Sequence, residues 1–142
     1  MKSFKWTRDY ALYVAELDAE HKAVFGALNG LAQLRSAELP VAKIQELFSD
    51  FFGHATKHFA HEERLMRATF YRSYTWHKRQ HDTARNRIAA LEPGLSNGDR
   101  TAVLELLDFL AEWLEHHIRV TDRMMSAYMQ NYWCANPMAR AS

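Results

Sequence analysis

The sequence predicts an all-α protein: an up-down-up-down antiparallel four-helix bundle with an extended N-terminal arm. Apolar residues recur at the i, i+3, i+4, i+7 spacing of an amphipathic helix over four long stretches of the chain. No stretch alternates between apolar and polar residues as a half-buried strand does. Because the connections between the stretches are short, successive helices are expected to be antiparallel neighbours in one domain of 142 residues.

The first element, over about residues 1–17, is expected to be an extended arm. Phe4, Trp6, Tyr10 and Tyr13 occur there without sustained helical periodicity. Aromatic rings gain most from burial when they lie on an apolar surface, so we expect the arm to lay these rings on the bundle.

Four helices follow, and each has a recognisable start or end. Asp18 is a favourable N-cap for the first helix, and Pro40 suits the first turn of the second. The segment Glu92-Pro93-Gly94 is expected to end the third helix. The helices are expected at about residues 18–36, 40–69, 73–92 and 99–128, with a loosely held tail at 129–142.

The composition limits the classes of function. With 18 Lys and Arg against 17 Asp and Glu, the net charge of +1 argues against a broad surface for nucleic acid or acidic membranes. The single Cys134 cannot form an intramolecular disulfide, and neither an 18-residue apolar run nor an N-terminal leader is evident. We therefore expect a cytoplasmic monomer with no nucleic-acid partner and no membrane insertion.

Seven side chains of metal-ligand types fall at one level of this predicted bundle. They lie near the start of the first and third helices and towards the end of the second and fourth. In an antiparallel bundle these four helix ends lie at the same end of the molecule. At about 1.5 Å rise per residue, all lie within roughly 5 to 18 Å of the same end. The seven are His21, His58, Glu62, His77, His81, His117 and Asp122.

The step from His117 to Asp122 is the exception to regular helical spacing. Residues at i and i+4 share a helix face, whereas a step of five turns the side chain by about 140°. A local π-type widening of the helix, which often marks functional sites, would bring Asp122 back towards the other donors.

Five imidazoles and two carboxylates in one buried layer require compensating partners, and no inward Lys or Arg is evident. Metal ions supply that compensation. This combination of imidazole and carboxylate ligands favours iron, and zinc is the main alternative. Seven such ligands suit two octahedral ions that share a solvent bridge and keep one open position. Ligation rich in His leans towards reversible oxygen binding over oxygen activation.

The three remaining histidines are less informative. His54 lies one turn from His58 on the same face, so it is a candidate second-layer contact to the ligands, with ordinary surface exposure as the alternative. His61 and His116 are close to ligands in sequence but offset around the helix, and we expect them to face solvent.

Four motifs occur in order over about residues 6 to 130. Because of these motifs, the chain resembles the hemerythrins, in particular the single-domain bacteriohemerythrins. A departure from the usual family pattern is Glu20, where Gln commonly precedes the first ligand. The motifs are Asp18-x-x-His21-Lys22, His58-Phe59-x-x-Glu62-Glu63-x-x-Met66, His77-x-x-x-His81 and Trp113-Leu114-x-x-His117-Ile118-x-x-x-Asp122.

The resemblance implies two non-haem iron ions with a bridging oxo or hydroxo group. It implies that His77, His81 and His117 bind one iron, that His21 and His58 bind the other, and that Glu62 and Asp122 bridge both. It further implies that dioxygen binds at the second iron, beside an apolar oxygen pocket whose matching residues are Phe59, Trp113, Leu114 and Ile118.

The leading functional expectation is reversible dioxygen binding for storage, transport or buffering, without enzymatic activity. One alternative is a di-iron enzyme, such as a peroxidase, an oxidase or a nitric-oxide-handling protein, that uses the same seven ligands. A second is an oxygen sensor acting through a separate partner. A third, structural alternative leaves the His layer empty or filled with zinc.

Overall fold

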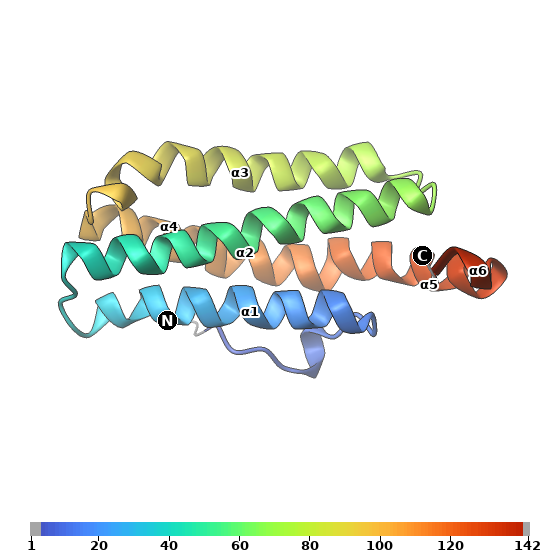
Figure 1. The fold of residues 1–142 in the computed structure, drawn as a ribbon, viewed down its shortest axis with the longest axis horizontal. Helices are drawn as coiled ribbons and strands as arrows, with labels where there is room; N and C mark the ends of the chain where they lie inside the picture. Colours follow the sequence, from blue (N-terminus) through green and yellow to red (C-terminus); the bar gives the residue numbers. More distant parts are fainter. Residues whose placement is uncertain (1–3, 141–142) are drawn as a thin grey trace.

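The computed structural model describes residues 4–140, and within that range it is helical without strands, which confirms the predicted all-α class. Four long helical segments lie side by side along the molecule (Figure 1). They are α1 (Ala15–Ala32), α2 (Val41–Ala68), α3 (Tyr74–Ser96) and a composite of α4 (Arg100–His116), the π-helical turn η3 (His117–Asp122) and α5 (Arg123–Ala135). Three short helices are η1 (Arg8–Tyr10), η2 (Gln33–Arg35) and α6 (Pro137–Arg140).

The chain reverses direction between one long segment and the next, as the colours of Figure 1 show. α1 packs against α2, α2 against α3, α3 against α4, and α4 returns to α1. Each long segment therefore borders two others, and the four enclose a single core.

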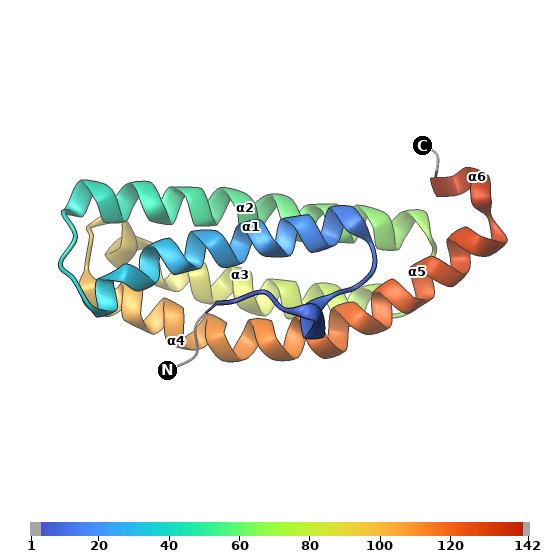
Figure 2. The same cartoon turned by 90° about the horizontal axis from the view of Figure 1, so that it is seen from below.

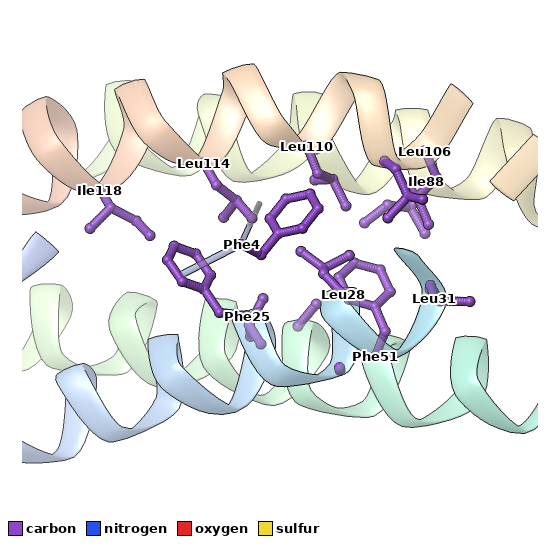
Figure 3. Packing of buried hydrophobic residues seen from close by; sticks show 14 of the residues in the cluster. Phe4, Phe25, Leu28, Leu31, Phe51, Ile88, Leu106, Leu110, Leu114 and Ile118 are labelled. Atoms are coloured by element: carbon purple, nitrogen blue, oxygen red, sulfur yellow. The ribbon is translucent and has the colours of Figure 1, made fainter. Parts of the chain in front are cut away.

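The core consists of the apolar stripes that the four segments turn inward. Leu28 of α1, Phe51 of α2 and Leu106 of α4 are almost completely buried, and Figure 3 shows side chains from opposite helices pointing towards one another across the interior. Most charged residues lie on the outer faces, as expected for amphipathic helices, and Glu62, Glu63 and Asp122 are buried exceptions. Accordingly, none of the helices within residues 4–140 is long and apolar enough to cross a membrane.

The N-terminal arm lies along α1 and reaches the composite fourth segment (Figure 2). The buried ring of Phe4 lies 6.3 Å from that of Phe25 in an edge-on arrangement, and the ring of Tyr10 lies 5.2 Å from it. The side chain of Asn29 donates to the Phe4 carbonyl and accepts from the Phe4 amide. Residues 1–3 of the predicted arm and 141–142 of the predicted tail lie outside the described residues.

The arm ends earlier than predicted, because α1 begins at Ala15 and Asp18 is not its N-cap. The carboxylate of Asp18 instead accepts hydrogen bonds from the amides of Leu12 (2.9 Å) and Tyr13 (3.2 Å). Asp18 therefore stabilises the turn before the helix, where Tyr13 has a positive φ of 60°, and the helix extends one turn upstream.

The predicted end of the third helix at Glu92-Pro93-Gly94 is also wrong, since α3 continues through Pro93 to Ser96. A proline inside a helix removes one backbone hydrogen bond. Here the extra turn completely buries Leu95, and the gain from apolar burial offsets that loss.

The predicted tail starts too early as well, because α5 extends to Ala135 and α6 follows it. Met129 and Trp133 are buried on this last part of α5. Gln130 donates from its amide nitrogen to the carbonyl of Leu12 in the arm, at 3.0 Å. Contacts with the N-terminal arm, more than a hundred residues away in the sequence, stabilise the end of α5 as a helix. No local sequence pattern predicts such contacts.

Two glycines should respond oppositely to replacement by alanine. Gly98, between α3 and α4, has a φ of 72°, and a Cβ there would lie 2.8 Å from a methyl group of Val41. Gly98→Ala is expected to lower the free energy of unfolding by about 1–3 kcal/mol, measured by urea denaturation at fixed metal loading.

Gly26 is the matched control, because it lies on the exposed face of α1 and a Cβ there would meet nothing within 4 Å. Gly26→Ala is expected to raise the free energy of unfolding by up to about 1 kcal/mol through helix propensity. Equal effects of the two substitutions would contradict the backbone conformation described for the turn at Gly98.

Candidate metal centre

The structure brings all seven predicted donors together as two adjoining clusters. Within each cluster the candidate ligand atoms lie within 4.8 Å of one another, and every member is buried. Both clusters include the same two carboxylates, those of Glu62 and Asp122. The first cluster consists of Glu62, His77, His81, His117 and Asp122, and the second of His21, His58, Glu62 and Asp122.

Asp122 directs one carboxylate oxygen towards each cluster. Its Oδ1 lies 3.0 Å from Nε2 of His77 and 3.0 Å from Nε2 of His117. Its Oδ2 lies 3.2 Å from Nε2 of His21. This division of oxygens is the arrangement that a carboxylate needs to bridge two cations.

Glu62 divides its oxygens in the same way. Its Oε1 lies 3.0 Å from Nε2 of His81 and 3.4 Å from Nε2 of His77. Its Oε2 lies 3.1 Å from Nε2 of His58 and 3.7 Å from Nε2 of His21. The two carboxylates together thus connect three imidazoles on one side with two on the other.

The π-helical turn predicted from the spacing of His117 and Asp122 is present as η3. In an α-helix these side chains would diverge by about 140°, but here Nε2 of His117 lies 3.0 Å from Oδ1 of Asp122. The widened turn therefore places the last carboxylate in the layer. Such turns are often found at functional sites.

Buried polar atoms in this layer lack hydrogen-bond partners, as expected if they are cation ligands. A buried polar group without a partner costs about 1–3 kcal/mol, and imidazole nitrogen together with carboxylate oxygen suits divalent transition metals. The donor set therefore fits two metal ions. Among residues 4–140 the partnerless atoms include Nδ1 and Nε2 of His21 and His77, Nε2 of His117, Oε2 of Glu62 and both carboxylate oxygens of Asp122.

Charge in the layer is balanced between carboxylates and imidazoles. Burial acts to lower the pKa of His58, but the charge of Glu62 and the hydrogen bonds to Glu20 and Glu62 together outweigh it and raise this pKa to about 10. Burial likewise opposes the effect of Asp122 and Glu62 on His77, whose pKa rises to about 9. Burial and Glu62 act to raise the pKa of Asp122, yet His117 and His21 hold it below its usual range. Without metal, the two carboxylates thus stabilise two protonated imidazoles.

An apolar cavity of about 20 Å³ adjoins the clusters. This is room for one very small molecule, since a single water needs about 10–15 Å³ on the same measure. The four predicted pocket residues, Phe59, Trp113, Leu114 and Ile118, all line it. Further apolar lining comes from residues that the sequence did not single out: Val24, Phe25, Phe51, Ala55, Ile88 and Leu110.

Aromatic rings cover the imidazoles next to the cavity. The ring of Phe59 stacks on that of His81 with centroids 4.4 Å apart, and the ring of Trp113 stacks on that of His117 at 4.2 Å. Figure 3 shows Phe25, Leu114 and Ile118 pointing into the interior from α1 and the fourth segment. Apolar groups therefore form most of the wall of the cavity next to the clusters.

Residues 12–128 match the family model described as the hemerythrin HHE cation binding domain. The chain belongs to the hemerythrin family. It is 28% identical over 129 residues to a bacteriohemerythrin of Ralstonia nicotianae, covering 91% of this chain and 90% of that protein. It is 27% identical over 124 residues to a bacteriohemerythrin of Clostridium acetobutylicum, covering 84% and 96%, and 28% identical over 120 residues to myohemerythrin-1 of Phascolopsis gouldii, covering 84% and 88%.

Three histidines of this hemerythrin domain have partners on the side away from the clusters, and the sequence did not reveal them. Nδ1 of His58 lies 2.7 Å from Glu20, and Nδ1 of His81 lies 2.7 Å from Glu63. Nδ1 of His117 lies 3.2 Å from Oε1 of Gln80. Such partners fix the tautomer and the ring orientation of metal-binding histidines.

Of the outlying histidines, His61 differs from expectation and His54 takes the second of the two alternatives left open for it. His61 was expected to face solvent, but it is partly buried and its Nδ1 lies 2.6 Å from Oε2 of Glu20. His54 was a candidate contact to the ligand layer, but it is exposed and its Nε2 lies 3.4 Å from Asp50, one turn away on α2. His116 is exposed, as expected.

Raising the pH from about 7 to 10 is expected to lower the free energy of unfolding of the metal-free protein. Imidazole in an unfolded chain titrates near about 6.5, whereas His58 and His77 have pKa values of about 10 and about 9 in the fold. Stabilisation by their protonation is complete below the unfolded pKa and is lost as the pH rises through the folded values. Urea titrations in the presence of a chelator measure this loss.

The double variant His58→Gln and His77→Gln should lose this alkaline dependence, whereas replacing the exposed His54 by Gln should leave it intact. Stability of the unmodified metal-free chain that stays constant up to pH 10 would contradict the charge balance described for the layer.

Proposed function

We propose that the two clusters bind two non-haem iron ions with a bridging oxo or hydroxo group, in the up-down-up-down four-helix bundle of a hemerythrin, and that this centre binds dioxygen reversibly. The observation that carries the proposal is the geometry of the layer: two buried donor clusters share two carboxylates next to a small apolar cavity.

The division of imidazoles between the two sides supports an unequal pair of irons. In this proposal His77, His81 and His117 would hold one iron, His21 and His58 would hold the other, and Glu62 and Asp122 would serve both. The second iron would then have one imidazole fewer and would keep a position for a small ligand. Both imidazoles of this second side, His21 and His58, line the cavity, whereas His117 is the one imidazole of the first side in the lining. The cavity therefore lies mainly on the side of the open position.

The chain's own residues would protect the reaction. When bound, the iron pair would coordinate dioxygen and exchange electrons with it. The rings of Phe59 and Trp113 and the aliphatic side chains of Leu114 and Ile118 exclude water from the cavity. A dry environment limits the supply of protons and so slows the irreversible loss of bound oxygen in reduced form.

The relatives support a binding role over catalysis, because they are named bacteriohemerythrin and myohemerythrin. We propose that the protein stores, transports or buffers dioxygen. Its balanced charge and single cysteine are compatible with a monomer in the reducing cytoplasm.

Mixing the anaerobic protein, loaded with two ferrous ions per chain, with dioxygen is expected to produce an absorption change that lasts for minutes and reverses under vacuum. Rapid, irreversible oxidation to the ferric form, with turnover of added peroxide, would identify an enzyme instead. An iron content well below two per chain after growth with iron would exclude the di-iron centre.

Replacing Leu114 by Ala is expected to shorten the lifetime of the oxygenated protein while two irons stay bound. Leu114 lines the cavity and is buried, so its truncation opens room for water beside the donors. Val103→Ala, at a buried position of α4 outside the cavity lining, controls for a general loss of core packing. An unchanged lifetime in Leu114→Ala would show that Leu114 does not protect the site.

A further inference from the structure

The carboxylate of Glu20 lies between two histidines of the neighbouring helix. Its Oε1 is 2.7 Å from Nδ1 of His58, and its Oε2 is 2.6 Å from Nδ1 of His61. His58 and His61 are three residues apart on α2, so they project to neighbouring positions that one carboxylate from α1 can reach. Both oxygens of Glu20 are therefore engaged, and the carboxylate is held in one orientation.

Glu20 is placed to accept a hydrogen bond from each of the two imidazoles. A carboxylate oxygen in such a contact accepts and the ring nitrogen donates, so the 2.7 Å contact requires a proton of His58 on Nδ1. The other nitrogen, Nε2, is then the free donor atom, and it faces Glu62 in the second cluster at 3.1 Å.

The other carboxylate behind a candidate ligand is in a different electrostatic setting. Oε2 of Glu63 accepts from Nδ1 of His81 at 2.7 Å and also from the guanidinium of Arg85 at 2.7 Å. The fixed positive charge of Arg85 neutralises much of the charge of Glu63. Among the ion pairs within residues 4–140, Glu20 is paired only with the imidazoles of His58 and His61. Glu20 thus directs more negative charge at its histidine than Glu63 does.

The second histidine of that cluster has no such support. Nδ1 of His21 has no hydrogen-bond partner within residues 4–140. Of the two imidazoles in this pair, His58 is therefore the one whose Nδ1 is hydrogen-bonded to a carboxylate. Both of these histidines line the apolar cavity, whereas His117 is the one imidazole of the other cluster that does; we therefore call the metal of His21 and His58 the cavity-side metal. Any effect of Glu20 on donor strength therefore acts on the metal that faces the cavity.

We propose that Glu20, held in place by His61, is a positioning residue for the metal centre: it fixes the ring of His58 with Nε2 towards the cavity-side metal and makes that nitrogen a stronger donor. A carboxylate hydrogen-bonded to the far nitrogen of a ligating imidazole raises the basicity of the ligand. A stronger donor stabilises the more oxidised metal, so Glu20 lowers the reduction potential of the cavity-side iron. This inference rests on the proposed di-iron function.

The test compares variants that separate the hydrogen bond of Glu20 from its charge. Glu20→Ala removes both, whereas Glu20→Gln keeps an acceptor oxygen and removes the charge. Glu38→Gln, at an exposed position before α2, is the matched control for loss of one carboxylate. For each full-length variant, the ferrous affinity is measured by competition with a chelator, and the reduction potential of the iron-loaded protein by a mediated redox titration.

Glu20→Ala is expected to bind ferrous iron about 10- to 100-fold more weakly than the unmodified chain, the usual cost of losing such a partner. Glu20→Gln is expected to bind two irons but to have a more positive reduction potential and shifted visible absorption bands. Glu38→Gln is expected to match the unmodified chain in every measurement.

Affinity and reduction potential in Glu20→Gln and Glu20→Ala that equal those of Glu38→Gln would overturn the proposal. If Glu20→Ala fails to fold, as judged by circular dichroism, the potential of Glu20→Gln alone decides. Failure of the unmodified chain to bind two irons would instead refute the proposed function, so the two outcomes are distinguishable.

Discussion

Two carboxylates without exposed surface, those of Glu62 and Asp122, determine how the rest of the molecule is arranged. Burying such charges is costly unless opposite charge or ligands surround them. Imidazoles from all four long helical segments converge on them, in a layer where apolar side chains would otherwise meet. The bundle can be well packed elsewhere with many combinations of apolar residues, but at this level it requires positive charge, either as protons or as metal ions.

The remaining features of the site follow from that requirement. Oxygens divided between two groups of imidazoles make two neighbouring positions for cations, and the unequal number of imidazoles makes those positions different. The apolar cavity is lined by both imidazoles of the less crowded position and by His117 of the other. Behind the layer, Glu20, Glu63 and Gln80 orient three of the rings. The asymmetry between the two positions is therefore present in both the ligands and their supporting hydrogen bonds.

Sequence periodicity was sufficient to predict the helices and the π-helical turn, because these depend on spacing within one helix. The seven converging donors followed once short connections made successive helices antiparallel, which brings the starts of two helices beside the ends of the other two. Periodicity was insufficient for Glu20 and His61, which pair across two helices at a distance that no local pattern reports. Boundaries failed where tertiary contacts overrode local signals: Asp18 caps a preceding turn, Pro93 is tolerated next to buried Leu95, and α5 is extended by contacts with the arm. The hydrogen bonds of Glu63 and Gln80 were missed for the same reason as that of Glu20.

The π-helical turn has a further consequence for the end of the chain. Inserting one residue into an α-helix rotates all following residues by about 100° about the helix axis. The wider π-helical turn η3 accommodates one such additional residue. As a result Asp122, Met125 and Met129 all remain on the buried side of a segment that also places His117 there. The metal-binding face and the buried face of α5 therefore share one register that depends on this turn, so removing its extra residue would turn Asp122 out of the layer and Met125 and Met129 out of the core together.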